Sequence, residues 1–173
     1  MKDVIVEIDL SGADLTGSSL NDAHLGGAVV SGTNLSGVTF TGTTSGGLTG
    51  VPVNLPAPYR IVGGYVVGPG TDLNDTSLPG IDLHGVDLTG VAFARSYLGG
   101  ANLAGATLTG ANLSGATLTG ANLTNATLTN ANLTNADLGT ATLTGVTSGG
   151  IIGTPASLPA GWQLVGGVLV HTG

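Results

Sequence analysis

The amino-acid sequence predicts an all-β solenoid in which the chain turns once every five residues. Apolar residues recur at every fifth position from Leu73 to Leu143, where 14 of 15 positions hold Leu and one holds Phe93. Gly, Asn or Asp lies two residues after nearly all of these positions, and Ala lies two residues before nine consecutive ones. An earlier block follows the same frame through Ile5, Leu10, Leu15, Leu20, Leu25, Val30, Leu35 and Phe40.

A period of five fits neither a helix nor a straight strand. Five residues advance an α-helix by about 500°, which would spread the leucines around its surface. Side chains of a strand alternate with a period of two, so an odd spacing would place successive leucines on opposite faces. If the chain turns at the Gly, Asn or Asp, which tolerate turn conformations, each Leu and the Ala two residues before it point inward. Three turn positions depart from this pattern, namely Glu7, Arg95 and Thr140.

The composition excludes several classes of protein. Charged residues make up 8% of the 173 residues and the mean hydropathy is +0.41, which is unlike a disordered chain. There is no Cys, so disulfides and Cys-based zinc sites are excluded. The chain has three Lys and Arg residues in total and a net charge of −7, so direct binding to nucleic acid is not expected. No apolar run approaches the roughly 20 residues of a membrane span.

The motif at residues 111–115, Ala-Asn-Leu-Ser-Gly, resembles the repeat of the pentapeptide-repeat family, and the resemblance extends over most of the chain. It implies a right-handed quadrilateral β-helix with four repeats in each coil. Residues one coil apart would then stack at about 4.8 Å, the spacing between strands. Asn102 would lie on Asn122, and Asn112 on Asn132, as ladders of side-chain amides.

Along the chain we expect four segments in one continuous domain. Residues 1–43 are predicted to form about two coils and residues 71–146 about four coils. Residues 44–70 are predicted to form a β-hairpin insert, and residues 147–173 a C-terminal β-hairpin unit that caps the solenoid.

The two hairpin units are copies of each other in sequence. Thr-Ser-Gly-Gly at residues 44–47 recurs at 147–150, and further matches follow in register. In each copy two apolar runs flank Gly-Gly, which is typical of a hairpin with a two-residue primed turn. The runs are 59–62 and 65–67 in the first copy, and 162–165 and 168–170 in the second. Because the first copy lies inside the chain, it must bulge from the side of the coils or interrupt them.

The sequence offers no catalytic set. His24, His84 and His171 are far apart, without metal-ligand spacing, and no Ser has a His partner in register. The Gly-rich stretches lack the phosphate-binding motifs and are interpreted as turns. We therefore predict no enzymatic activity, no cofactor and no metal site.

One candidate interaction patch combines aromatic residues of the hairpins with acidic residues of the second repeat block, and Asp75 lies at a corner close by. The acids form either an acidic face or ordinary solvated positions. Because they fall on different sides of one coil, a shared calcium site is not expected. In the hairpins the aromatic side chains form either a recognition patch or ordinary packing. The patch consists of Tyr59, Tyr65, Trp162, Asp72, Asp82 and Asp87.

A second candidate surface is a face of stacked threonines. Thr107 and Thr109 precede Thr127 and Thr129 by the length of one predicted coil, so the two pairs would lie one above the other and point outward. Such a face could bind ice or another crystalline surface. The alternative is that Thr simply suits exposed strand positions.

The favoured function is a non-catalytic structural or interaction module that binds an unidentified protein partner, with end-to-end association as a further expectation. The family resemblance implies one alternative, a DNA mimic that acts on DNA gyrase. Against it, residues 101–173 contain one acid, Asp137, and no Lys or Arg. We expect a cytoplasmic protein if the chain is complete, and an extracellular one if it is a fragment of a larger secreted protein.

Overall fold

The chain divides into two compact units, Met1–Val67 and Gly68–Gly173. The computed structural model describes residues 8–173, so Ile5 and Glu7 of the predicted frame lie outside the described residues. The predicted boundaries of the four segments, and their union in one domain, stay predictions.

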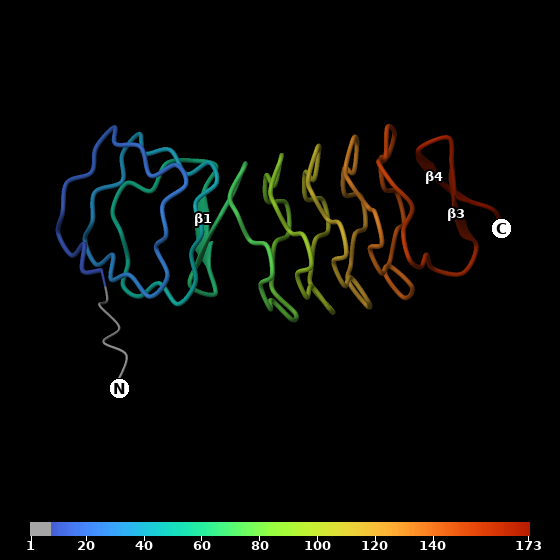
Figure 1. Ribbon diagram of the computed structural model, residues 1–173, viewed down its shortest axis with the longest axis horizontal. Coiled ribbons are helices and arrows are strands. Elements are labelled where there is room, and N and C mark those ends of the chain that lie inside the picture. The colour runs from blue at the N-terminus through green and yellow to red at the C-terminus, as the bar shows by residue number, and fades with distance from the viewer. Residues whose placement is uncertain (1–7) are drawn as a thin grey trace. The chain divides into compact units, whose positions relative to one another are not determined.

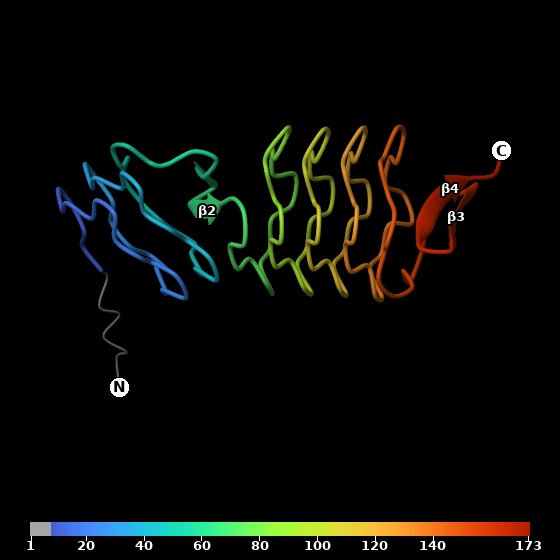
Figure 2. The ribbon, with the colours of Figure 1, turned by 90° about the horizontal axis from the view of Figure 1, so that it is seen from above.

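The second unit is a stack of four-sided coils, which Figures 1 and 2 show side by side from green to orange. Parallel β-bridges join residues 20 apart, and they form four separate ladders that begin at Asp72, Ser77, Asp82 and Asp87. On each side of a coil, one residue forms the bridge to the neighbouring coil, and the chain then turns at the next corner. For example, Leu103 N–H donates to Asn122 O (2.8 Å), and Asn122 N–H donates to Ala101 O (2.9 Å). The predicted quadrilateral β-helix is confirmed.

A tight turn at each corner explains the Gly, Asn and Asp of the repeat. At a representative corner, Ala106 N–H donates to Leu103 O (3.0 Å), and Gly105 between them has a φ of 65°. A type II turn requires this left-handed conformation at its third residue. Arg95 adopts it as well, with a φ of 58°. Thr140 does not, and its hydroxyl instead accepts the N–H of Gly120 from the neighbouring coil (2.9 Å).

The core of the second unit consists of the inward Leu and Ala positions. Leu103, Leu118 and Ala121 have no exposed surface, and Phe93 is equally buried at its Leu position. The residues on either side of each Leu point outward and are mostly half-exposed. The predicted alternation of inward and outward positions is therefore confirmed.

The first unit follows the same plan with less uniform residues. Its bridges again form four ladders, which begin at Asp9, Asp14, Ser19 and His24. Where the second block has Ala, this unit buries Thr33 and Thr43, whose hydroxyls donate to Leu10 O and Leu20 O (2.7 Å each). Burial of a hydroxyl costs little when it is hydrogen-bonded in this way.

Both predicted hairpins are present as two-stranded antiparallel sheets. Strands β1 (Arg60–Val62) and β2 (Tyr65–Val67) form the first, and β3 (Trp162–Val165) and β4 (Val168–His171) form the second. Both Gly residues of each turn have positive φ, as a type I′ turn requires. The first apolar run begins at Tyr59 in the sequence, but the N–H of Tyr59 closes a turn onto Pro56 O (3.0 Å), so β1 begins one residue later.

The hairpins dock on the coils through the same two hydrogen bonds in each copy. In the first, Leu48 N–H donates to Gly64 O (3.0 Å) and Val66 N–H to Ser45 Oγ (2.8 Å). In the second, Ile151 N–H donates to Gly167 O and Leu169 N–H to Ser148 Oγ (3.0 Å each). The duplicated Thr-Ser-Gly-Gly segment thus supplies the serine that holds each hairpin. Val66 belongs to the core cluster of the first unit, so that hairpin packs on the core of its coils.

Candidate interaction surfaces

The side of the second unit that contains Asn102 carries a ladder of polar side chains. Asn102 Nδ2 donates to Asp82 Oδ1 (2.9 Å), and Asn122 Nδ2 lies 3.5 Å from Asn102 Oδ1. The predicted Asn102–Asn122 ladder is confirmed, and it continues to an aspartate. Asn112 and Asn132 also share a backbone ladder. Their Oδ1 atoms, however, accept the N–H groups two residues further on, at 3.2 and 3.0 Å, and no hydrogen bond joins the two amides.

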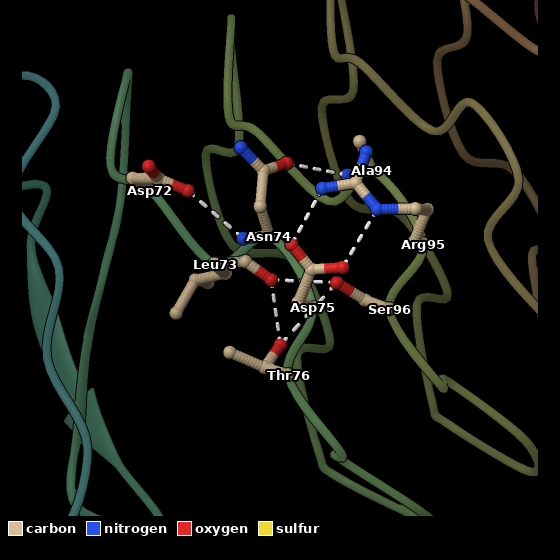
Figure 3. A network of polar contacts seen from close by, with 8 residues as sticks. All are labelled: Asp72, Leu73, Asn74, Asp75, Thr76, Ala94, Arg95 and Ser96. Carbon is tan, nitrogen blue, oxygen red and sulfur yellow. Dashed lines mark hydrogen bonds and ion pairs between the residues drawn. The ribbon is translucent and has the colours of Figure 1, made fainter.

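An ion pair between neighbouring coils lies at one corner of the second unit (Figure 3). Arg95 lies 20 residues after Asp75, and its Nε and Nη2 atoms reach the two carboxylate oxygens at 2.7 and 2.5 Å. The hydrogen bonds and charge of Arg95 hold the pKa of the Asp75 carboxyl below its usual value, and that carboxylate raises the pKa of Arg95. Both side chains are mostly exposed, so we expect a small contribution to stability.

Buried and half-buried hydroxyls support this corner from inside (Figure 3). Thr76 Oγ1 and Ser96 Oγ both donate to Leu73 O (2.6 Å each), and Asn74 Oδ1 accepts the N–H of Ala94 (2.6 Å). Ser96 occupies the position that Ala takes in later repeats, and its hydroxyl is satisfied although it is only 1% exposed. The network ties two neighbouring coils together, which is a structural role.

Replacement of Arg95 by Gln should raise the pKa of Asp75 toward its ordinary value of 3.8. Because the pKa of this carboxyl is lowered in the folded protein, the ion pair stabilises the fold above the unfolded value and ceases to do so as the pH falls through the folded value. A titration of the Asp75 carboxyl carbon by NMR, in the wild type and the variant, measures the shift. Identical titration curves would contradict the contact.

The acidic residues of the predicted patch are not brought together. Asp72, Asp82 and Asp87 begin three different ladders, and each carboxylate accepts the N–H two residues further along, at Asn74, His84 and Thr89 respectively. Among residues 8–173 no group of three His, Asp or Glu side chains could hold a metal ion.

The aromatic residues of the predicted patch lie in two different units and pack locally. The ring of Tyr59 meets Phe40 of the core, with centroids 4.9 Å apart. Tyr65 covers Gly46, where an added Cβ would come within 3.0 Å of its ring. Trp162 meets His171 across the second hairpin, with centroids 5.2 Å apart. These contacts favour the packing interpretation, and the recognition patch stays a prediction.

Thr107 and Thr127 of the predicted threonine face lie one above the other, and the face as a binding surface stays a prediction. A bridge joins Thr107 to Thr127, and the ladder continues to Thr147. The hydroxyls of the four predicted threonines make no hydrogen bond within the described chain. On the neighbouring sides, by contrast, Thr124 donates its hydroxyl to Asn122 (2.6 Å) and Thr134 to Asn132 (2.7 Å). The threonine face therefore presents hydroxyls that are available to solvent or a ligand.

Two features were missed from the sequence. The Asp75–Arg95 pair could have been found, because Arg95 departs from the turn pattern and lies one coil after an acid at the same corner. The second hairpin also exposes Val165 (55%) and Val168 (38%), which strand alternation could have indicated. In the described part of the chain there is no pocket and no helix that could cross a membrane.

Comparison with known proteins gives one family. The model for pentapeptide repeats matches eight copies, over residues 7–44, 70–105, 87–125 and 106–145. No curated protein matches the chain.

HetL, Rfr23 and QnrB1 are among the solved structures that resemble the chain, and the first two are described as pentapeptide repeat proteins. HetL of Nostoc sp. strain PCC 7120, described as involved in the regulation of heterocyst differentiation, is 31% identical over 82% of this chain and 64% of its own, with a TM-score of 0.48. The chain thus spans less than two thirds of HetL. Rfr23 of Cyanothece 51142 is 23% identical over 84% of this chain and 91% of its own (TM-score 0.48). QnrB1, a plasmid-mediated fluoroquinolone resistance protein, is 18% identical over 81% of this chain and 67% of its own, with a TM-score of 0.43.

Proposed function

Because the chain belongs to the pentapeptide-repeat family, whose model matches more than half of it, we propose that it is a non-catalytic structural or protein-interaction module. The regular outer surface of the second unit is the observation that carries the proposal. Each side presents side chains from successive coils in one row, and beyond Arg95 most of these are uncharged amides and hydroxyls. Solenoids bind partners over extended surfaces of this kind.

Four variants, each changing one side of the second unit, test the proposal. Asn132→Lys, Thr117→Lys, Asn122→Lys and Thr107→Lys each place a charge on a different ladder, at an outward position. Cross-linking of the purified chain in extract of its source cells should capture a protein that one of the four variants loses and the others retain. Equal capture by all four, or a reproducible hydrolase or transferase activity of the wild type, would contradict the proposal.

A second candidate function, binding to ice or another crystalline surface, is favoured by the unoccupied hydroxyls of the threonine face. On this face the threonines of neighbouring coils lie about 4.8 Å apart, and the two threonines of one pair lie roughly 6.6 Å apart along the side, so together they form a regular array. The array is narrow, however, because the same ladder begins with Asp87. This candidate ranks below the interaction module.

The threonine face predicts a specific loss of activity. If the chain binds ice, Thr129→Lys should abolish thermal hysteresis, whereas Thr124→Lys should keep it. Both residues are half-exposed and follow a core Leu, but the hydroxyl of Thr124 is already bonded to Asn122. Hysteresis measured by nanolitre osmometry decides the matter, and equal values for both variants would remove this candidate.

The DNA-mimic alternative has less support. A mimic needs rows of carboxylates, whereas the part of the second unit from residue 101 onward has Asp137 as its one acid. We expect the chain at micromolar concentration to leave supercoiling by purified DNA gyrase unchanged. Inhibition or protection of the enzyme would restore this alternative.

A further inference from the structure

Tyr97 presents a flat aromatic surface on one side of the second unit. It is 46% exposed, and it is the one aromatic residue at an outward position of the repeat frame. A Cβ built on Gly99 would lie 2.5 Å from the hydroxyl oxygen of Tyr97, 2.6 Å from Cζ and 3.1 Å from Cε1. A point in the plane of the ring at the first two distances would come closer to a Cε atom, so Gly99 lies against the flat side of the ring. The opposite side of the ring is therefore turned toward solvent.

The ring, and not the backbone, explains the glycine at position 99. The left-handed conformation of this corner belongs to Gly100, with a φ of 67°, whereas Gly99 does not have a positive φ. Other residues can adopt the conformation of Gly99, and Thr119 occupies the same position one coil later. Because any side chain at position 99 would collide with the ring, the glycine lets the ring lie flat on the coil.

Hydroxyl groups lie beside the ring. Bridges join Ser77 to Tyr97 and Tyr97 to Thr117, so Thr117 lies one coil from the ring, and Thr119 points outward on the same side. The hydroxyls of Thr117 and Thr119 make no hydrogen bond within the described chain. We call this region the Tyr97 surface, which consists of Tyr97, Gly99, Thr117 and Thr119.

The charged residues on this side and at its two corners are already paired inside the protein. Arg95 forms its ion pair with Asp75. Two coils from Tyr97 on the same ladder, the carboxylate of Asp137 accepts the hydroxyl of Ser157 and the N–H of Gly139 (3.0 Å). The Tyr97 surface is therefore aromatic and polar, and it has no free charge to offer a ligand.

We propose that the Tyr97 surface binds a neutral polysaccharide, an activity that goes beyond the proposed protein interaction and does not rest on it. The C–H groups on one side of a sugar ring are weakly positive, and the flat side of an aromatic ring is negative, so the two stack. Sugar hydroxyls can then bond to the free threonine hydroxyls. Because the described part of the chain has no pocket, a polymer that lies along the coils fits this surface better than a single sugar does.

Two other ligands of an aromatic ring fit the surface less well. A cation is attracted to the ring, but the carboxylate on this side that would balance its charge is already bonded to Ser157. A nucleic acid stacks its bases on aromatic rings, but its phosphates need basic residues, and this chain has three Lys and Arg in total. An uncharged ligand with many hydroxyls avoids both difficulties.

Native gel electrophoresis with a polysaccharide cast in the gel tests the proposal, because bound protein migrates more slowly. The probes are hydroxyethylcellulose, arabinoxylan, galactomannan and glycol chitin, and at least one of them should retard the wild type. Tyr97→Thr, which introduces the residue found one coil later, should abolish the retardation, whereas Tyr97→Phe keeps the ring and should retain it. Thr107→Ala changes a half-exposed residue on another side and is the matched control, which should migrate like the wild type. None of these variants alters the charge of the chain, so their mobilities compare directly.

Gly99→Thr tests the stacking geometry without removing the ring. Its Cβ would meet the end of the tyrosine side chain, which can rotate away, so the fold should be kept while the ring no longer lies flat. We expect the affinity for the polysaccharide to fall by about tenfold or more, as the loss of an aromatic contact does. Circular dichroism confirms that each variant is folded.

Four results would overturn the proposal. They are a wild type that none of the four polysaccharides retards, equal retardation of Tyr97→Thr, an unchanged affinity in Gly99→Thr, and NMR shifts of the Tyr97 ring with tetramethylammonium but with none of the polysaccharides. The last result would show a site for cations in place of sugars.

Discussion

Replacement of Leu118 by Ala should lower the free energy of unfolding by about 2–5 kcal/mol, as truncation of a buried Leu does. Leu118 lies in the middle of the second unit and has no exposed surface. It packs among coils that are closed on all four sides by backbone hydrogen bonds, so the structure has little freedom to collapse into the cavity. Denaturant titration followed by the fluorescence of Trp162, which lies in the same unit, measures the loss.

Thr119→Ala is the control for this prediction. Thr119 is the next residue, half-exposed on the outer surface, and its removal should change the free energy by no more than about 0.5 kcal/mol. A change of less than about 0.5 kcal/mol in Leu118→Ala would contradict the inward position of the leucine.

Replacement of Gly64 by Ala should destabilise the first unit by about 2–4 kcal/mol, through backbone strain and overpacking together. Gly64 has a φ of 79°, a left-handed backbone conformation that is unfavourable for any residue with a Cβ. A Cβ there would also lie 3.1 Å from Gly47 N and 3.2 Å from Leu48 N, where the hairpin docks on the coils. Neither neighbour is the end of a flexible side chain, so the contact cannot be relieved by rotation.

The neighbouring and duplicated turns supply two controls. Gly63 also has positive φ, but a Cβ there meets nothing within 4 Å, so Gly63→Ala should lose only the strain term of about 1–2 kcal/mol. Gly167, the counterpart of Gly64, has its nearest contact at 3.4 Å, an ordinary distance. Denaturant titration followed by circular dichroism compares the free energies of unfolding of the Ala variants at Gly63, Gly64 and Gly167. If Gly64→Ala costs no more than Gly63→Ala, the close docking of the first hairpin is wrong.

Much of the fold could be predicted because it repeats. A Leu every five residues with Gly, Asn or Asp two residues later leaves few chain paths that bury every leucine. The Gly-Gly turns likewise identify both hairpins. The candidate sites were harder to predict. Tyr59 and Trp162 are the aromatic residues expected of a recognition patch, yet each packs on a ring of its own unit, Phe40 and His171 respectively.

The sequence by itself determined where this chain turns and which side chains point inward, because φ preferences and strand alternation act over a few residues. The tertiary structure alone decided which outward hydroxyls find partners. The hydroxyl of Thr124 bonds to Asn122, whereas the hydroxyl of Thr129 bonds to no described residue. It also decided that Ser45 and Ser148 hold the hairpins. The physical reason is that a side chain pairs with its spatial neighbours, and many of those neighbours lie a whole coil away in the sequence.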